Sequence, residues 1–214
     1  MRKGEAKGKL RELRDAVKDV KLRARVLERV SEFELNRRAA EDKWFQELVL
    51  CILTANSSFV SAYRAFNAIS AFMPTRDVDI ISARLREAGY RFYNIKARYI
   101  AEASQYYGKL KQWILPLAME DQLQARSELT YVKGIGLKEA SHFLRNVGFY
   151  DLAIVDRHVV DFVNAMGFNV KQPNSIRLYL IIEGILKSIA SRLNLKVGIL
   201  DLYLWYIETG TILK

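Results

Sequence analysis

A lysine and an aspartate stand eighteen residues apart, at positions where their side chains could do chemistry. Lys138 falls on the first turn of an expected helix. The positive end of a helix disfavours a cation, so it favours an uncharged amine, which is a nucleophile. Asp156 comes where another helix should begin, and its carboxylate could stabilise a cationic transition state and take part in proton transfer. The ordinary alternatives are a solvated surface lysine and a simple helix cap.

The residues before Lys138 predict a hairpin between two helices. Gly134 and Gly136 flank Ile135, and a new helix follows at once. Glycine permits the backbone angles of a tight reversal and leaves no side chain to keep a ligand away. Unpaired N–H groups at the start of the new helix suit a phosphate, a contact that positions a nucleic-acid backbone without reading its sequence. A plain turn with glycine at the helix C-cap is the alternative, but the basic composition favours phosphate binding.

The composition makes a polyanion the first partner to consider. Lys and Arg number 34 against 24 Asp and Glu in 214 residues, so the formal net charge is +10. Hydrophobic residues make up 50% of the chain, which excludes a disordered protein, and 11 Gly and 3 Pro are too few for a β-sandwich or small barrel. One cysteine excludes a disulfide framework and a cysteine-ligated zinc or iron–sulfur site. With no apolar run of membrane-spanning length and no apolar signal core, we expect a soluble intracellular protein without a membrane partner.

Apolar residues recur at three- and four-residue spacing along almost the whole chain, which predicts about ten helices and no sheet. The stripe over residues 44–53 predicts a helix that enters the core, with Asp42 as its cap and Cys51 as an inert core thiol. Thr75 is expected to cap a later helix, and Pro116 to mark a boundary between two helices. No linker rich in glycine or serine announces a domain boundary.

Three segments together resemble a known superfamily of DNA glycosylases. Residues 132–140, VKGIGLKEA, followed by residues 155–159, VDRHV, are similar to its helix-hairpin-helix plus Gly/Pro…Asp (HhH-GPD) signature, and the bifunctional members carry lysine where Lys138 stands. Residues 52–58, ILTANSS, resemble the segment that enters the duplex beside the damaged base. The lack of a cysteine cluster argues against the iron–sulfur-bearing endonuclease III and adenine-glycosylase branches. The short length and the final TGTILK are most similar to the archaeal type-2 8-oxoguanine DNA glycosylase/lyase branch.

The resemblance implies a fold and a reaction. The fold would be all-α with two lobes and an active-site cleft between them: residues 1–56 plus 148–214 as a lobe formed by both chain ends, and residues 57–147 as a helical barrel lobe. The reaction would be base-excision repair of double-stranded DNA containing 8-oxoguanine, in which Lys138 forms a Schiff base with the sugar and β-elimination cuts the strand, with Asp156 assisting. No metal and no organic cofactor is expected. A monomer in the cytoplasm, associated with the nucleoid of a prokaryote, is expected.

The resemblance also assigns residues that contact the base and the duplex. Phe92 and Trp205 would sandwich the base, although for either ring taken alone a packing role is the better interpretation. Lys214, the last residue, would reach the lesion, the alternative being a frayed terminus. Asn56 would fill the gap left in the duplex or simply cap a helix, and His158 would touch phosphate or be a structural histidine.

Other readings of the same residues stay open. A non-enzymatic helix-hairpin-helix module explains the charge and the hairpin but gives no reason for Lys138 and Asp156 together, and strand scission without metal would distinguish it. The same scaffold with another oxidised-base specificity would differ in pocket shape, which a substrate panel would test. An RNA-binding helical protein is a more remote alternative, which competition by RNA would test.

Overall fold

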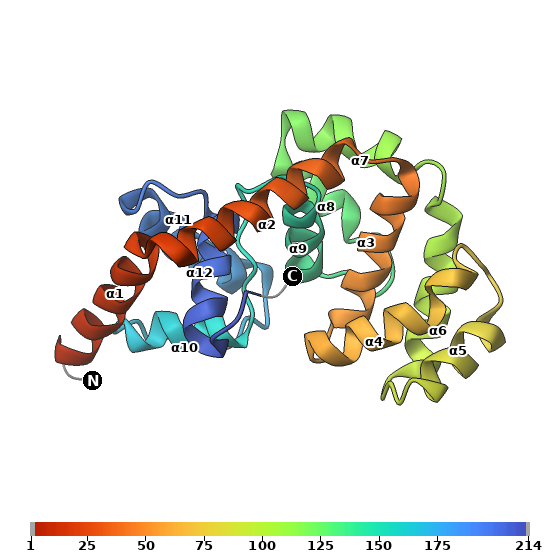
Figure 1. Cartoon of the computed structure of the whole chain (residues 1–214), viewed down its shortest axis with the longest axis horizontal. Coiled ribbons are helices and arrows are strands. Elements are labelled where there is room, and N and C mark those ends of the chain that lie inside the picture. Colours follow the sequence, from red (N-terminus) through yellow and green to blue (C-terminus); the bar gives the residue numbers. More distant parts are fainter. Residues whose placement is uncertain (1–2, 213–214) are drawn as a thin grey trace. The chain divides into compact units, whose positions relative to one another are not determined.

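The computed structural model describes residues 3–212, and within them the chain is helical throughout, apart from its turns, with no strand (Figure 1). The all-helical class predicted from the spacing is therefore confirmed. No helix among these residues combines the length and apolar character that crossing a membrane requires. The elements in chain order are α1 (Lys3–Lys18), α2 (Val20–Arg38), α3 (Glu41–Thr54), α4 (Phe59–Ile69), η1 (Ser70–Phe72), α5 (Val78–Glu87), α6 (Tyr93–Ala103), η2 (Ser104–Tyr106), α7 (Leu110–Glu120), α8 (Gln122–Leu129), α9 (Leu137–Asn146), α10 (Arg157–Ala165), α11 (Ile176–Arg192) and α12 (Val197–Thr209).

The helices form two compact units. Among the described residues, unit 1 comprises 3–34 and 148–212, and unit 2 comprises 35–147. The predicted boundary at residue 56 was wrong, because residues 35–56 belong with the hairpin unit. Helix α3 packs on α4, α6, α7 and α9, all of unit 2, and the division between units falls inside the continuous helix α2.

Helix α3 is the centre of unit 2. Nine of the ten residues from Trp44 to Leu53 are buried, so the helix is surrounded on all sides. The Trp44 ring meets the edge of the Phe143 ring at 5.7 Å between centroids, which seats α9 against α3. Each fully buried side chain of this size contributes about 1.5–3 kcal/mol of hydrophobic stabilisation. Burial on this scale fixes the helix that carries Lys138.

Three local predictions were wrong for identifiable reasons. Ala40, not Asp42, is the N-cap of α3, since Asp42 lies inside the first turn and accepts a hydrogen bond from Tyr107. Asp77, not Thr75, caps α5. Pro116 lies inside α7, where Leu110, Ile114 and Ala118 are buried. A proline inside a helix removes one backbone hydrogen bond, and here the burial of that apolar face outweighs the loss.

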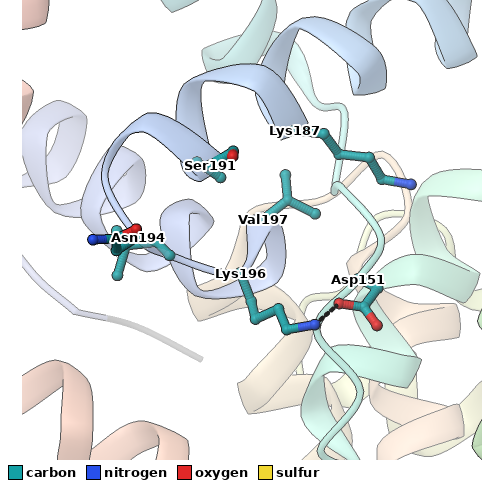
Figure 2. A pocket seen from close by; sticks show the side chains of 8 residues that line it. Asp151, Lys187, Ser191, Asn194, Lys196 and Val197 are labelled. Carbon is teal, nitrogen blue, oxygen red and sulfur yellow. Dashed lines mark hydrogen bonds and ion pairs between the residues drawn. The ribbon is translucent and has the colours of Figure 1, made fainter.

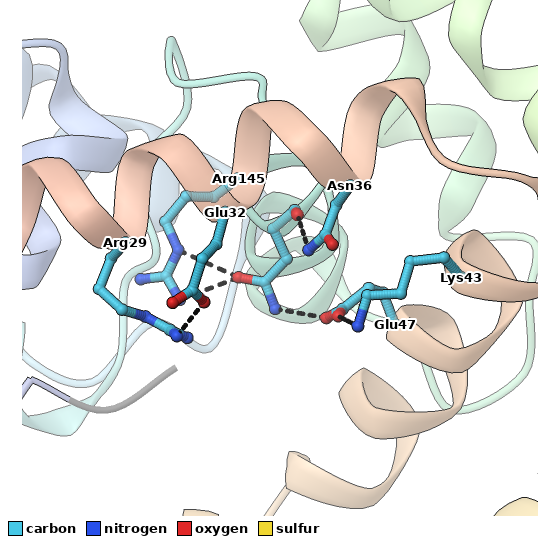
Figure 3. A network of polar contacts seen from close by, with 7 residues as sticks. Arg29, Glu32, Asn36, Lys43, Glu47 and Arg145 are labelled. Carbon is cyan, nitrogen blue, oxygen red and sulfur yellow. Dashed lines mark hydrogen bonds and ion pairs between the residues drawn. The ribbon is translucent and has the colours of Figure 1, made fainter.

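A buried polar network holds the end of α9 against α2 and α3 (Figure 3). Nδ2 of Asn146 donates to Oε2 of Glu47 at 3.0 Å, and its Oδ1 accepts from Arg145 at 3.1 Å. The Asn146 carbonyl accepts from Nδ2 of Asn36 at 2.9 Å. Lys43 pairs with Glu47 at 3.1 Å, although Glu47 itself is almost fully buried. The network ties together three segments that are distant in sequence.

We expect Glu47→Ala to lower the free energy of unfolding by about 2 kcal/mol, because the buried amide of Asn146 loses its acceptor. Urea denaturation measures the change. Glu87→Ala is the matched control, since Glu87 forms an exposed pair with Arg84 and its loss is expected to cost less than about 0.5 kcal/mol. Equal effects of the two substitutions would contradict a structural role for the network.

Candidate active site

The predicted hairpin is present in unit 2, between α8 and α9. Ile135 is buried at its tip, and its N–H donates to the Val132 carbonyl at 3.0 Å. Gly134 has φ +88°, in the left-handed region that favours glycine. A Cβ added to Gly134 would lie 2.6 Å from Cδ2 of Tyr99 on α6. The turn therefore depends on glycine both for its backbone angle and for the close approach of the Tyr99 ring.

We expect Gly134→Ala to destabilise the protein by about 2 kcal/mol or more, because backbone strain and the clash with Tyr99 add together. Thermal or urea unfolding measures this loss. Gly89→Ala is the control, since Gly89 has φ +71° but nothing within 4 Å of an added Cβ. It should show only the backbone cost of about 1 kcal/mol. If both variants lose the same stability, the Tyr99 contact does not constrain the turn.

The N-cap residue of helix α9 is Gly136, which has no side chain that could cap the helix. Instead, Oε2 of Glu139 accepts the Gly136 N–H at 3.3 Å. Oε1 of the same carboxylate pairs with Nζ of Lys138 at 2.9 Å. The Lys138 side chain is 31% exposed, so it is partly open to solvent while its Nζ pairs with Glu139. One carboxylate thus joins the hairpin backbone to the predicted nucleophile.

A second lysine, Lys96, lies within electrostatic range of Lys138 and Glu139. Lys96 on α6 is buried, and its Nζ donates to the Ile52 carbonyl at the end of α3, at 2.7 Å. Burial lowers the pKa of Lys96, the Glu139 carboxylate opposes that shift, and the positive charge of Lys138 adds to it. The amine of Lys138 therefore stands among charges of both signs.

Two further titratable groups of unit 2 are buried. Burial raises the pKa of the Cys51 thiol, which is fully enclosed, as expected of an inert core cysteine. Burial likewise lowers the pKa of His142 well below its ordinary value, and its Nε2 has no hydrogen-bond partner among the described residues. Both groups are uncharged at neutral pH.

Two more of the predicted residues lie in unit 2. Asn56 is exposed with φ +62° directly after the C-cap of α3, as the cap interpretation requires, and its exposure also suits a contact with DNA. Phe92 precedes α6, and the Arg91 guanidinium carbon lies 4.2 Å from its ring centroid. The hydroxyl of Tyr90 donates to the Leu53 carbonyl at 2.5 Å, which brings the Phe92 segment to the end of α3.

The remaining predicted residues belong to unit 1. Asp156 is the N-cap of α10, and its Oδ1 accepts the Val159 N–H at 2.9 Å. The ring of His158 stands edge-on to the ring of Trp205 at 5.4 Å between centroids. Unit 1 therefore gathers an acid, an imidazole and an indole at the first turn of α10. Lys214 lies outside the described residues.

Known proteins are similar in sequence to this chain along almost its whole length. A family profile described as 8-oxoguanine DNA glycosylase matches residues 26–195. The chain is 56% identical over 207 residues to the 8-oxoguanine DNA glycosylase/AP lyase of Saccharolobus solfataricus, covering 94% of this chain and 100% of that protein. The chain belongs to the 8-oxoguanine DNA glycosylase family. A family member from Sulfolobus acidocaldarius, with the same name as the S. solfataricus enzyme, is 54% identical over the same shares of the two chains.

Solved structures of the glycosylase family agree with this membership. The Methanocaldococcus jannaschii 8-oxoguanine glycosylase/lyase, crystallised with a 15mer DNA containing 8-oxoguanine, matches with a TM-score of 0.88 and 34% identity, over 96% of this chain and 99% of that one. The 8-oxoguanine DNA glycosylase of Thermotoga maritima matches with a TM-score of 0.87 and 36% identity, over 98% and 100%. The predicted HhH-GPD fold is confirmed.

A pocket of unit 1 is separate from the residues that family resemblance assigns. Its volume is about 550 Å³, and its lining at the end of α11 and the start of α12 includes Lys187, Ser191 and Asn194 (Figure 2). Nζ of Lys196 pairs there with Oδ1 of Asp151 at 2.6 Å. None of the predicted catalytic or base-contacting residues lines it.

Sequence reasoning missed two residues that shape the charge environment of Lys138. Glu139 had a readable signal, because a glutamate three residues after an N-cap position is the spacing of a capping box. Lys96 had a weaker one, since it shares the buried face of α6 with Ala97 and Ile100, where a charged residue is unusual. Neither signal alone connects these side chains with Lys138.

Proposed function

We propose that the chain removes 8-oxoguanine from double-stranded DNA and then cuts the strand at the resulting abasic site, as a base-excision-repair DNA glycosylase with AP lyase activity. The observation that carries this proposal is the 56% identity to a relative of that name, over the relative's whole length. The hairpin, with Lys138 on the first turn after it, gives the proposal its chemistry.

Lys138 is the nucleophile of the proposed reaction. Once Nζ has given up a proton, the amine attacks the sugar C1′ of an extruded nucleotide, the bond from C1′ to the base breaks, and the base leaves with a proton. The sugar ring opens as the amine gives up its proton, and a Schiff base remains between Nζ and C1′. Loss of a proton from C2′ then expels the 3′ phosphate, which is the lyase step.

Asp156 is the charge-stabilising partner in this proposal. As the bond to the base breaks, positive charge develops on the sugar, and a carboxylate lowers the energy of that state. Only Oδ1 of Asp156 is used as the cap of α10. Among the described residues, Oδ2 has no hydrogen-bond partner, so the carboxylate keeps an oxygen for the sugar or for the lysine proton.

The other assigned residues hold the DNA. Backbone N–H groups of the hairpin at Gly134 and Gly136 bind phosphate at the start of α9, and His158 touches another phosphate. Asn56 fills the gap that the extruded nucleotide leaves in the duplex. The exposed position of Asn56 supports this assignment.

Base recognition falls to aromatic rings and the chain end. Phe92 and Trp205 stack on the two faces of the extruded base, and Lys214 offers donor and acceptor groups to its edge. Nε1 of Trp205 is buried and has no hydrogen-bond partner among the described residues. The enzyme acts as a monomer on the DNA of a nucleoid.

A cleavage assay with matched duplexes tests the proposed function. We expect a strand carrying 8-oxoguanine to be cut in the presence of a metal chelator. Cutting at undamaged guanine should be at least about 10²-fold slower, because the pocket contacts must distinguish the two bases. Faster excision of an oxidised pyrimidine would favour the alternative specificity on the same scaffold. Binding without any cutting would favour the non-enzymatic module.

A further inference from the structure

A second basic site lies on unit 2, outside the residues assigned above. It is a pocket of about 400 Å³ lined by Arg76, Val78, Arg98, Ala101, Glu102 and Gln105. Neither arginine has an ion-pair partner among the side chains that the structure describes. Glu102, the acidic residue of the lining, is already paired with Nζ of Lys133 at 3.0 Å. The pocket therefore carries uncompensated positive charge.

Both arginines stand on fixed backbone. Arg98 lies within α6, and Arg76 lies between two anchored residues. Before it, the Thr75 carbonyl accepts a hydrogen bond from Oγ of Ser104 at 2.8 Å; after it, Asp77 caps the first turn of α5. A side chain on an anchored backbone loses less freedom when it binds an anion, so the pocket is preorganised.

Helix α6, which lines the pocket, also contacts the hairpin. The Tyr99 ring of this helix packs against Gly134, and Glu102, one turn after Arg98, pairs with Lys133 just before the turn. The helix that supplies Arg98 to the pocket therefore also supports the hairpin.

We propose that the pocket formed by Arg76 and Arg98 binds a backbone phosphate of the same DNA duplex that the hairpin holds. A guanidinium presents paired N–H donors that match phosphate oxygens, so two arginines in one concave site suit this group. The contact adds affinity and fixes the duplex without reading its sequence. The inference rests on the proposed function, since it takes duplex DNA as the ligand.

The test compares two double variants that each remove two positive charges. Arg76→Gln with Arg98→Gln removes the pocket's charge; Arg84→Gln with Arg86→Gln removes the same charge from the neighbouring helix α5, outside the pocket. Binding of an undamaged duplex longer than two helical turns is measured by fluorescence anisotropy between about 50 and 200 mM salt. We expect the pocket variant to bind about tenfold more weakly at low salt, with a salt slope smaller by about 1. The control pair should leave both values unchanged.

The proposal is overturned if the pocket variant keeps the parent's salt slope, or if the control pair lowers the slope equally. It is also overturned if inorganic phosphate, at fixed ionic strength, stabilises the parent but not the pocket variant while the DNA slope stays the same, because the pocket then takes free phosphate. If the double variant has a lowered melting temperature, the binding measurement is repeated with the single variants Arg76→Gln and Arg98→Gln. Single-turnover cutting of an 8-oxoguanine duplex at low salt separates the two claims: a parent that does not cut refutes the proposed function, whereas normal cutting with an unchanged slope refutes only the pocket.

Discussion

Lys138→Gln is expected to abolish covalent trapping of the protein on 8-oxoguanine DNA by borohydride. Borohydride reduces a Schiff base to a stable amine, so the adduct reports the bond between Nζ and the sugar. Glutamine has no nucleophilic amine, and base removal should fall at least about 10³-fold, which corresponds to about 4 kcal/mol of lost transition-state stabilisation. Single-turnover excision and gel analysis of the adduct measure both effects.

The hairpin supplies a matched control for this prediction. Lys133 lies just before the turn, is 65% exposed and pairs with Glu102, so Lys133→Gln removes the same charge without removing the proposed nucleophile. That variant should bind somewhat more weakly but form the adduct in full. An active Lys138→Gln variant, or an adduct lost equally in Lys133→Gln, would remove Lys138 from the mechanism.

Loss of activity in Lys138→Gln should not come from unfolding. The Glu139 carboxylate keeps its hydrogen bond to the Gly136 N–H whatever stands at position 138, so the start of α9 stays capped. Glutamine also retains a donor for Oε1 of Glu139, which lysine occupies in the parent. The melting temperature is therefore expected to stay close to that of the parent, and it should be measured beside the rate.

The parts that were predictable from the sequence obey local rules. The left-handed turn at Gly134 and the cap at Asp156 each depend on a few adjacent residues, so residue type and spacing were enough to find them. The charge environment of Lys138 was not predictable in this way. Lys96 contributes to that environment only because α6 packs against α3, where the carbonyl of Ile52, 44 residues earlier in the chain, accepts a hydrogen bond from its Nζ. Such contacts follow from packing, which a single sequence does not display.

The unit boundary shows the same limit at larger scale. Periodicity continues without a break through α2, because one helix crosses from unit 1 to unit 2 at Glu34 and Leu35. A boundary inside a helix has no glycine, proline or change of composition to mark it. Asn36 and Glu47 form hydrogen bonds with Asn146 of α9, which join residues 35–56 to unit 2. The sequence alone does not show that these polar side chains have this partner.

Asp156→Asn is expected to slow base removal by about 10²-fold or more while DNA binding and stability are kept. Asparagine is as good an N-cap as aspartate, and its carbonyl oxygen can accept the Val159 N–H that Oδ1 accepts in the parent. The free energy of unfolding should therefore change by less than about 0.5 kcal/mol. The substitution removes only the negative charge and the proton acceptor.

Two companion variants separate the cap from the charge. Asp156→Ala loses both, so it should be as slow as Asp156→Asn and also lose about 1 kcal/mol of stability. Asp161→Asn removes an exposed charge from the same helix, where it pairs with Arg157 at 3.8 Å, and should change neither property. If Asp156→Asn cuts at the parent's rate while Asp156→Ala only melts earlier, Asp156 is a cap and nothing more. The positive charge that develops on the sugar would then need another carboxylate, and another group would have to accept the proton that Lys138 must lose before it attacks.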